Sequence, residues 1–419
     1  MLGLCDCNNF FVSCERVFDP SLEGRAVVVM SSNDGCVIAR SNEAKALGIK
    51  MGQPLYQIKE LIARENVATL STNLQLYGDM SQRVMQVLRE NIPSVEIYSI
   101  DEAFLDFSGF DLATVEEFGR NLSRKVRRAT GIPVSIGIAP TKTLAKIASK
   151  LCKQYPKLRG CCLMYRPEDI AKVLSKYPIE DVWGVGRKYA KELRKFGVST
   201  AAQFVDSPPE WVRAKMSIVG LRTWRELGGE ACLGFGYTTP ERQSIMVSRS
   251  FAHEVDDLAI LTESVVTFAS NAAEKLRRQG SVAGQLQVFI FTNRHREDQP
   301  QHSEGRLAQF LTPTDSTLEI VAQATQLLRE LFYRGFGYKK AGVILYDISS
   351  KQGVQSAMFD PLDRTKHTAL MEVLDRINND MGRSTLRVGS QGNSGVPTNS
   401  QHRSPLYTTS WSDILTIKV

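Results

Sequence analysis

Three carboxylates stand where short apolar segments begin or end, and their residue types suggest a site for hard divalent cations. Asp6 ends the apolar segment that begins at Gly3, and Asp101 and Glu102 lie between two β-like segments, 95–100 and 103–107. Mg²⁺ binds oxygen ligands and commonly shares them with substrate phosphates. Two such ions about 3.5–4 Å apart can activate an attacking hydroxyl and stabilise a leaving pyrophosphate. Each carboxylate alone is more often a turn residue, so the metal prediction depends on all three lying together.

The segments around these carboxylates alternate between strands and helices. Runs of β-branched residues predict strands at 26–30 and 132–139, and apolar residues at helical spacing predict a helix over 78–91 that Pro93 ends. Thr141 is the predicted N-cap of another helix. The side of that helix opposite its apolar face carries four lysines: Lys142, Lys146, Lys150 and Lys153.

The second half of the chain changes in character twice. Residues 165–235 read as helical, with a glycine-containing hairpin, and from about 242 strands and helices alternate again as a second α+β unit. Residues 389–404 are rich in Gly, Ser and Asn and cannot bury a core, so we expect them to be mobile. The pattern predicts an α+β multidomain protein.

Charge is concentrated in one block of the sequence. The net charge is +7, yet residues 141–200 hold fourteen Lys or Arg against five Asp or Glu, so the rest of the chain is slightly acidic. Such a block is typical of nucleic-acid binding or of a solvated helix surface, and charge alone does not separate the two. The chain has no long apolar run, secretion signal or Cys-x-x-Cys pair, so we expect a cytoplasmic protein without a membrane span or a zinc site.

Several motifs, in their order and spacing, resemble those of the Y-family translesion DNA polymerases, and most closely the UmuC-like branch, the catalytic subunit type of DNA polymerase V. The palm motifs of that family are matched by DCNNFFVSCE (6–15), YSIDEAFLDF (98–107) and GIAPTKTLAKIASK (137–150). The resemblance continues through NDGCVIARSNEAKALGIKMG (33–52), DVWGVGRKYAKEL (181–193) and RSPLYTTS (403–410).

This resemblance implies a right-hand polymerase. Its parts would be a palm at 1–19 and 71–165, fingers at 20–70, a helical thumb with a helix-hairpin-helix at 166–240, a little finger at 241–350 and a flexible C-terminal tail with a clamp-binding motif at 351–419. It also implies a template-directed, low-fidelity DNA polymerase for translesion synthesis in the SOS response to DNA damage, and hence mutagenesis. The alternative is a non-catalytic DNA- and clamp-binding scaffold, against which the joint presence of three carboxylates argues.

The family match assigns roles around the predicted metal site. Asp6, Asp101 and Glu102 are the implied catalytic ligands of two Mg²⁺ ions, with the Cys7 carbonyl as a further oxygen ligand. Phe11 matches a steric gate against the ribose 2′-hydroxyl. Phe10 belongs to the same nucleotide-binding segment, although core packing is its preferred interpretation.

Further positions match residues that face the incoming nucleotide. Asn42 and Lys45 in the fingers and Lys146 in the palm match positions near the triphosphate. The start of the helix after Pro140 could add to this anion site. Lys142, Lys150 and Lys153 are interpreted as a solvated face or as DNA-backbone contacts.

The remaining assignments concern macromolecular partners. Primer-template DNA would contact the hairpin and the little finger, through Gly184, Gly186, Arg187, Lys188 and Arg249. QSAMFD (355–360) resembles a sliding-clamp peptide with Gln355, Met358 and Phe359 as its contacts; the alternative is a terminal strand packed against its own fold. The resemblance also implies a cleaved UmuD-like dimer and a RecA filament as activating partners.

Overall fold

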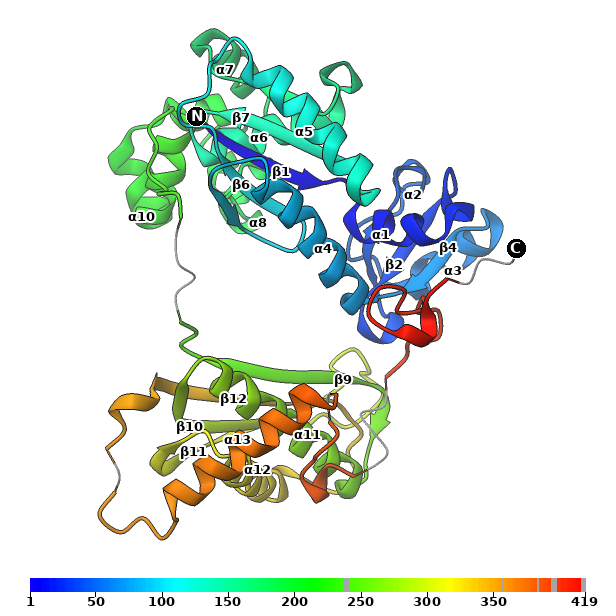
Figure 1. Ribbon diagram of the computed structural model, residues 1–419, viewed down its shortest axis with the longest axis vertical. Coiled ribbons are helices and arrows are strands. Elements are labelled where there is room, and N and C mark those ends of the chain that lie inside the picture. Colours follow the sequence, from blue (N-terminus) through cyan, green and yellow to red (C-terminus); the bar gives the residue numbers. More distant parts are fainter. Residues whose placement is uncertain (237–240, 356, 383, 393–397, 416–419) are drawn as a thin grey trace. The chain divides into compact units, whose positions relative to one another are not determined.

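The computed structural model describes residues 1–236, 241–355, 357–382, 384–392 and 398–415. It divides the chain into two compact units (Figure 1). The first unit comprises residues 1–238 together with 401–419, and the second comprises residues 239–400. The C-terminal segment therefore returns to the unit that contains the N-terminus.

A five-stranded sheet forms the centre of the first unit, with the strand order β5-β6-β1-β7-β8. Its strands are β1 (Leu2–Cys7), β5 (Val95–Ile97), β6 (Glu102–Asp106), β7 (Val134–Ala139) and β8 (Cys161–Leu163). β1 lies between β6 and β7 and is antiparallel to both, and the register places Asp6 opposite Glu102 on one side and Ser135 on the other. The sheet alone therefore brings two of the predicted carboxylates together.

Helices cover both faces of this sheet because successive side chains of each strand point to opposite faces. Cys5 and Ala103 pack with α1 (Phe10–Phe18), α4 (Leu74–Arg89) and α5 (Val115–Thr130), whereas Leu4 and Phe104 pack with α6 (Lys142–Gln154).

Gly137 allows α6 to lie very close to the sheet. A Cβ atom on this residue would stand only 2.1 Å from the backbone nitrogen of Ser149. This close approach fixes where the lysines of α6 reach.

Two smaller parts complete the first unit. A three-stranded sheet with the order β3-β2-β4 has its own small core, and a group of helices packs against α6. The sheet part comprises β2 (Val27–Met30), β3 (Val37–Arg40), β4 (Ala68–Ser71), α2 (Asn42–Ala46) and α3 (Leu55–Arg64). The helical part comprises α7 (Pro167–Leu174), α8 (Arg187–Lys195), α9 (Ala201–Val205) and α10 (Pro209–Leu227).

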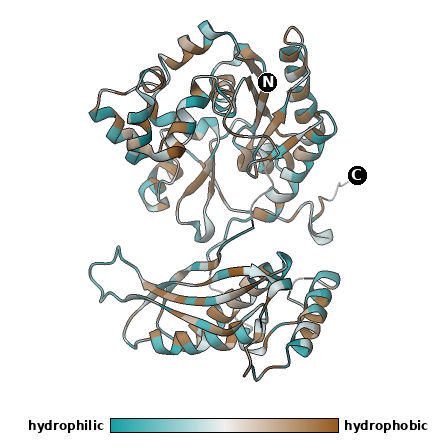
Figure 2. Ribbon diagram, turned by 90° about the vertical axis from the view of Figure 1, so that its left-hand side faces the viewer, coloured by the Kyte–Doolittle hydropathy of each residue, from teal (hydrophilic) through white to brown (hydrophobic). Residues whose placement is uncertain are grey.

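The second unit is a four-stranded antiparallel sheet with the order β11-β10-β12-β9, packed against helices. Its elements are β9 (Ile245–Val255), α11 (Leu258–Arg278), β10 (Ser281–Thr292), β11 (Ser303–Thr314), α12 (Thr317–Leu331), β12 (Tyr338–Ser350) and α13 (Arg364–Asp380). In Figure 2, hydrophobic and hydrophilic residues alternate along the elements of each unit, as expected for elements with one buried face. The predicted α+β class is confirmed.

The prediction of a flexible tail over 351–419 is wrong in two places. Helix α13 packs on the second unit, where Met371 is 1% exposed and Asp375 pairs with Arg277 at 2.7 Å. Residues 402–407 bind to the first unit through backbone and side-chain hydrogen bonds. Both segments are polar on average, and their few apolar side chains find partners only in the tertiary fold. Of the expected mobile stretch 389–404, residues 393–397 lie outside the described residues.

No helix in the described ranges is long and apolar enough to cross a membrane. The proposed limits between palm, fingers, thumb and little finger stay predictions.

Candidate active site

The three predicted carboxylates lie close together where β1 ends and β6 begins, in the middle of the central sheet. Asp6 lies near the end of β1 and Glu102 at the start of β6, directly opposite it in the antiparallel register. Asp101 precedes Glu102, and its carbonyl accepts a hydrogen bond from the Cys7 backbone nitrogen at 2.9 Å. Strand register, rather than sequence distance, therefore places residues about a hundred positions apart in one site.

Two lysines of α6 form ion pairs with Asp6 and Glu102. Lys153 Nζ lies 2.5 Å from Asp6 Oδ1, and Lys146 Nζ lies 2.7 Å from Glu102 Oε1. The pKa of Asp6 is raised to about 6, and burial is the main cause. The positive charge of Lys153 opposes this rise, whereas the negative charges of Glu102 and Asp101 add to it. The site thus concentrates negative charge that cations balance.

The carboxylate oxygens of this site are the ligand type that a hard cation prefers, but their present positions do not form a metal-binding group. Within the described residues, no three His, Cys, Asp or Glu side chains form a group that could hold a metal ion as they stand. Asp6 and Glu102 instead bind the ammonium groups of Lys153 and Lys146, which occupy the positions where a divalent cation could bind the same oxygens. Burial keeps the pKa of the Cys7 thiol well above its ordinary value, so this residue can offer a hard cation only its carbonyl oxygen.

The turn between β1 and α1 places an aromatic ring beside the site. Asn9 adopts a left-handed backbone conformation with φ 48°, and α1 begins at the next residue. Phe10 then points into the core and is 4% exposed, which supports core packing for this residue. Phe11 is half-buried and stacks on Tyr77, with ring centroids 4.4 Å apart.

The smaller sheet part contributes polar groups next to this turn. Lys45 Nζ donates to Asn9 Oδ1 at 2.6 Å and to Asn42 Oδ1 at 3.2 Å, and Asn9 Nδ2 donates to Asn42 Oδ1. Burial lowers the pKa of Lys45, and the nearby charges of Arg40 and Lys153 lower it further. The structure therefore brings Asn42 and Lys45 close to the β1–α1 turn and within electrostatic range of Lys153.

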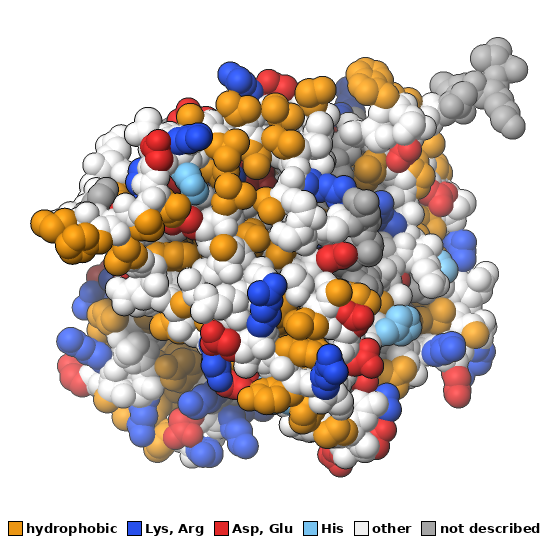
Figure 3. All heavy atoms as spheres, turned by 90° about the horizontal axis from the view of Figure 1, so that it is seen from below, with side chains coloured by type: hydrophobic (Ala, Val, Ile, Leu, Met, Phe, Trp, Pro, Cys, Tyr) orange, Lys and Arg blue, Asp and Glu red, His pale blue; other side chains and the backbone are white. Residues whose placement is uncertain are grey.

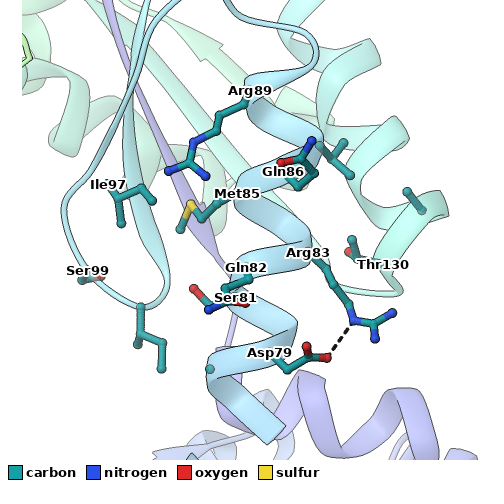
Figure 4. A pocket seen from close by; sticks show the side chains of 14 residues that line it. Asp79, Ser81, Gln82, Arg83, Met85, Gln86, Arg89, Ile97, Ser99 and Thr130 are labelled. Atoms are coloured by element: carbon teal, nitrogen blue, oxygen red, sulfur yellow. Dashed lines mark hydrogen bonds and ion pairs between the residues drawn. The ribbon is translucent and has the colours of Figure 1, made fainter. Parts of the chain in front are cut away.

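An open cavity of about 890 Å³ lies beside the carboxylates, between α4 and the β5–β6 hairpin (Figure 4). Arg89 and Met85 of α4 project toward Ile97 of the hairpin, whereas Arg83 turns to its ion-pair partner Asp79. Ser99 also lines this cavity. Its hydroxyl donates to Asp101 Oδ1 at 2.6 Å, so a residue of the cavity wall contacts one of the three predicted carboxylates.

The four lysines of α6 have different environments, and the interpretation of Lys142 is wrong. Lys142 is 3% exposed and is held by Glu96 at 2.7 Å, so it belongs to no solvated face. Lys153 binds Asp6 although its side chain is 34% exposed, and a DNA contact by this residue stays a prediction. Lys150 pairs with Asp181 at 2.9 Å. Lys146 and Lys153 are seven residues apart, and this spacing on one helical face was the signal that could have identified Lys153.

The start of α6 does not form the anion site that the sequence suggested. The backbone nitrogen of Thr143 donates to Glu226 Oε2 at 3.0 Å, and the Thr141 hydroxyl donates to the Glu226 carbonyl. Glu226 is fully buried on α10. This internal carboxylate occupies the helix terminus that a phosphate would need.

The residues predicted to contact DNA lie on exposed positions of both units. Gly184 and Gly186 precede α8, and Arg187 and Lys188 begin it with exposed side chains. Gly184 has φ +89°, a conformation that favours glycine, and a Cβ there would stand 2.8 Å from Thr223 Oγ1. Arg249 is exposed on β9 in the second unit.

The predicted clamp contacts are exposed in the second unit. Met358 and Phe359 are 90% and 85% exposed, and Gln355 is exposed as well. The Ala357 backbone nitrogen donates to Thr312 Oγ1 at 3.1 Å, which fixes the segment beside the two apolar side chains. Figure 3, seen from below, shows hydrophobic side chains interspersed with both kinds of charge on the surface.

Comparisons with known proteins identify the family of this chain. The impB/mucB/samB family model matches residues 5–150, its HHH motif matches 167–198 and its C-terminal domain matches 242–358. A domain of unknown function matches residues 368–417. Protein UmuC of Salmonella typhimurium is 40% identical, and protein ImpB of the same organism is 38% identical; the alignments cover 100% and 99% of this chain and the same shares of each relative.

The fold has a counterpart among solved structures. A Y-family DNA polymerase chimera matches with a TM-score of 0.65 and 22% identity, covering 83% of this chain and 99% of the chimera. This likeness confirms the predicted right-hand architecture of palm, fingers, thumb and little finger. Because these relatives align over the full length at about 40% identity, the chain belongs to the impB/mucB/samB family; it is similar to UmuC and has the fold of a Y-family DNA polymerase.

Proposed function

We propose that this chain performs translesion synthesis by template-directed transfer of nucleotides from dNTPs to a primer 3′-hydroxyl. The observation that carries the proposal is the meeting of Asp6, Asp101 and Glu102 where β1 ends and β6 begins, with α6 lysines beside them. This site combines oxygen ligands for cations with fixed positive charge for a triphosphate.

Y-family polymerases generally need divalent metal ions, and we propose two Mg²⁺ ions for this chain. Asp6, Asp101, Glu102 and the Cys7 carbonyl are the residues that would hold them. When bound, such ions lower the pKa of the primer hydroxyl and stabilise charge on the leaving pyrophosphate. These residues fit this role because they offer oxygen ligands, and because the carboxylates of Asp6 and Glu102 already pair with cationic lysine side chains.

The chain's own residues supply positioning and charge around the nucleotide. Lys153 and Lys146 can exchange their carboxylate contacts for phosphate oxygens, and Lys45 lies next to the β1–α1 turn, where it binds Asn9. Phe11 would lie under the sugar and exclude a 2′-hydroxyl, because its ring is braced by Tyr77. Catalysis then depends on orientation and electrostatic stabilisation more than on a side-chain base.

Primer-template DNA would bind through the hairpin before α8 and through the second unit. Gly184 has a positive φ, and a tight turn of this kind lets backbone N–H groups approach a phosphate. Arg187 and Lys188 add positive charge at the start of α8. Arg249 is the corresponding contact on β9.

Further partners follow from the exposed tail motif and from the relatives. Gln355, Met358 and Phe359 would insert into a sliding clamp, since exposed apolar side chains on a fixed loop suit docking. The UmuC relative supports a cleaved UmuD-like dimer as a partner, and a RecA filament completes the proposed activating set.

The experiment is extension of a primer across an abasic site by the purified chain with Mg²⁺. It is performed with the chain alone and with a cleaved UmuD-like dimer and a RecA filament. We expect Mg²⁺-dependent extension that the partners increase. DNA binding without extension under every condition would instead support the non-catalytic scaffold.

A further inference from the structure

The C-terminal segment 402–407, here called the strap, is fastened to the catalytic unit at β4 and α4. The Ser71 backbone nitrogen donates to the His402 carbonyl at 2.9 Å, and the His402 nitrogen donates to Ser71 Oγ at 3.1 Å. Asn73 Nδ2 donates to Ser404 Oγ at 2.9 Å and to the carbonyls of Ser404 and Pro405 at 3.1 and 3.2 Å. Figure 1 shows the strap beside β4.

An aromatic contact adds a second attachment. The ring of Tyr407 stacks on Phe18 at the end of α1, with centroids 4.8 Å apart and planes inclined by 10°. Tyr407 also packs against the hydrophobic core of this unit. The strap therefore contacts α1 as well as α4, the two helices that carry Phe11 and Tyr77.

The strap reaches a buried carboxylate under the proposed sugar gate. Glu15 on α1 is 2% exposed, and its Oε1 accepts hydrogen bonds from Tyr77 Oη at 2.6 Å and Ser404 Oγ at 3.1 Å. Within the described residues no lysine or arginine forms an ion pair with Glu15, and its carboxylate accepts hydrogen bonds from these two hydroxyl groups. A buried carboxylate depends strongly on each donor, because water cannot replace a lost one.

The same tyrosine connects this carboxylate to the gate. Tyr77 stacks on Phe11 with an angle of 14° between the ring planes. Ser404, Glu15, Tyr77 and Phe11 thus form a continuous series of direct contacts from the C-terminal segment to the nucleotide site.

We propose that the strap is a positioning element for sugar selection: Ser404 holds Glu15 and Tyr77 so that Phe11 keeps the orientation that excludes a ribose 2′-hydroxyl. This assigns a role to part of the segment 368–417, which is matched only as a domain of unknown function. The inference rests on the proposed polymerase function and on Phe11 as the gate.

The test measures the ratio of rNTP to dNTP incorporation, as kcat/KM, in the full chain with its activating partners. Ser404→Ala removes one donor to Glu15 and leaves the strap backbone in place, whereas Ser404→Thr keeps the hydroxyl. Tyr407→Leu weakens the aromatic attachment independently. Ser412→Ala is the matched control, because its hydroxyl contacts only Ser410 and Asp413 among the described residues.

We expect Ser404→Ala and Tyr407→Leu to raise the rNTP-to-dNTP ratio by about two- to tenfold, in the direction of Phe11→Ala, while Ser404→Thr and Ser412→Ala stay near the wild type. In a Phe11→Ala background, Ser404→Ala should change the ratio by less than about twofold, since the contact series then lacks its end. A purely structural loss would lower both incorporation rates equally and leave the ratio unchanged.

The outcomes separate this inference from the proposed function. An unchanged ratio for Ser404→Ala in an active, normally folded enzyme would overturn the strap proposal and leave polymerase activity intact. Equal effects of Ser404→Ala in both backgrounds would overturn it as well. Absence of all incorporation by the wild-type chain with its partners would contradict the proposed function itself. Thermal unfolding of each variant establishes that the compared proteins are folded.

Discussion

The four lysines of α6 show how neighbours decide what one residue type does. Lys142 is buried against Glu96, Lys150 pairs with Asp181 away from the carboxylates, and Lys146 and Lys153 each bind a proposed metal ligand. All four carry the same charge, yet only two of them pair with Glu102 and Asp6. Substitutions on this single helix can therefore separate lysines beside the proposed metal ligands from lysines elsewhere.

Asp101→Asn should reduce nucleotide incorporation by about 100-fold or more, because the amide lacks the charge that would hold a divalent cation. Single-turnover primer extension measures the loss, and DNA affinity should stay near that of the wild type. The matched control is Asp106→Asn at the other end of β6, where the carboxylate accepts a bond from the Ser108 nitrogen at 2.8 Å. Nearly normal incorporation by Asp101→Asn would reject the metal assignment.

Lys153→Gln should raise the KM for dNTP by about tenfold while kcat changes less, since a charge-assisted contact to the triphosphate would be lost. Lys150→Gln lies on the same helix and provides the control, because its partner Asp181 is outside the site. Steady-state kinetics over a range of dNTP concentrations distinguishes the two. Equal kinetic constants for both variants would leave Lys153 without a role in nucleotide binding.

At the scale of elements, the helix-hairpin-helix separates backbone conformation from side-chain chemistry. Its two glycines are only two residues apart, yet Gly184 has φ +89° and Gly186 has φ −78°. A Cβ atom added at Gly184 would stand close to Thr223, whereas one added at Gly186 would have no atom within 4 Å. The first therefore needs glycine for its conformation. The second is required only if DNA approaches that position closely.

This difference gives a paired prediction for Gly184→Ala and Gly186→Ala. The first variant should lose about 1–3 kcal/mol of stability, because alanine is strained at positive φ and its methyl group meets a threonine. The second should keep its stability, and weaker DNA binding by it would point to a direct phosphate contact. Chemical denaturation and fluorescence anisotropy measure the two effects. If Gly184→Ala were as stable as the wild type, the turn would not impose the observed conformation.

For the whole molecule, the basic block 141–200 contains both paired and unpaired positive charge. Six of its fourteen Lys and Arg side chains form ion pairs: Lys142, Lys146, Lys150, Lys153, Arg194 and Lys195. The others form none within the described residues, and they include Arg187 and Lys188. The block therefore combines charges that shape the site with charges that face solvent.

DNA affinity should accordingly fall by at least about 100-fold between about 50 and 200 mM salt, because phosphate contacts release counterions. Replacing Arg187 and Lys188 by Gln should reduce the slope of this dependence by about one to two units. Anisotropy titrations on a primer-template provide both values. A flat salt response would identify the block as a solvated surface instead.

The double substitution Met358→Ala and Phe359→Ala should abolish clamp binding and clamp-stimulated synthesis, since these exposed side chains would be the main anchors of a small interface. Extension of short primers without clamp should be nearly unchanged. Met381→Ala, another exposed methionine of the same unit, is the control. Surface plasmon resonance against immobilised clamp is the measurement, and wild-type affinity of the double variant would exclude this segment as the tether.

The sequence by itself determined the chemistry and most of the local structure. Apolar spacing and capping residues act locally, so the strand around 132–139, the helix after Thr141 and the carboxylates at segment ends were predictable. The strand β11 was missed because most of its side chains are exposed or only partly buried, so its sequence shows no apolar run.

Only the tertiary structure decided which of these residues meet. Antiparallel register placed Asp6 opposite Glu102, and close packing over Gly137 set the reach of Lys153. The fold also turned a polar C-terminal segment into the strap that contacts Glu15. Such contacts join residues tens to hundreds of positions apart, and their free energy comes from burial and geometry that no local pattern contains.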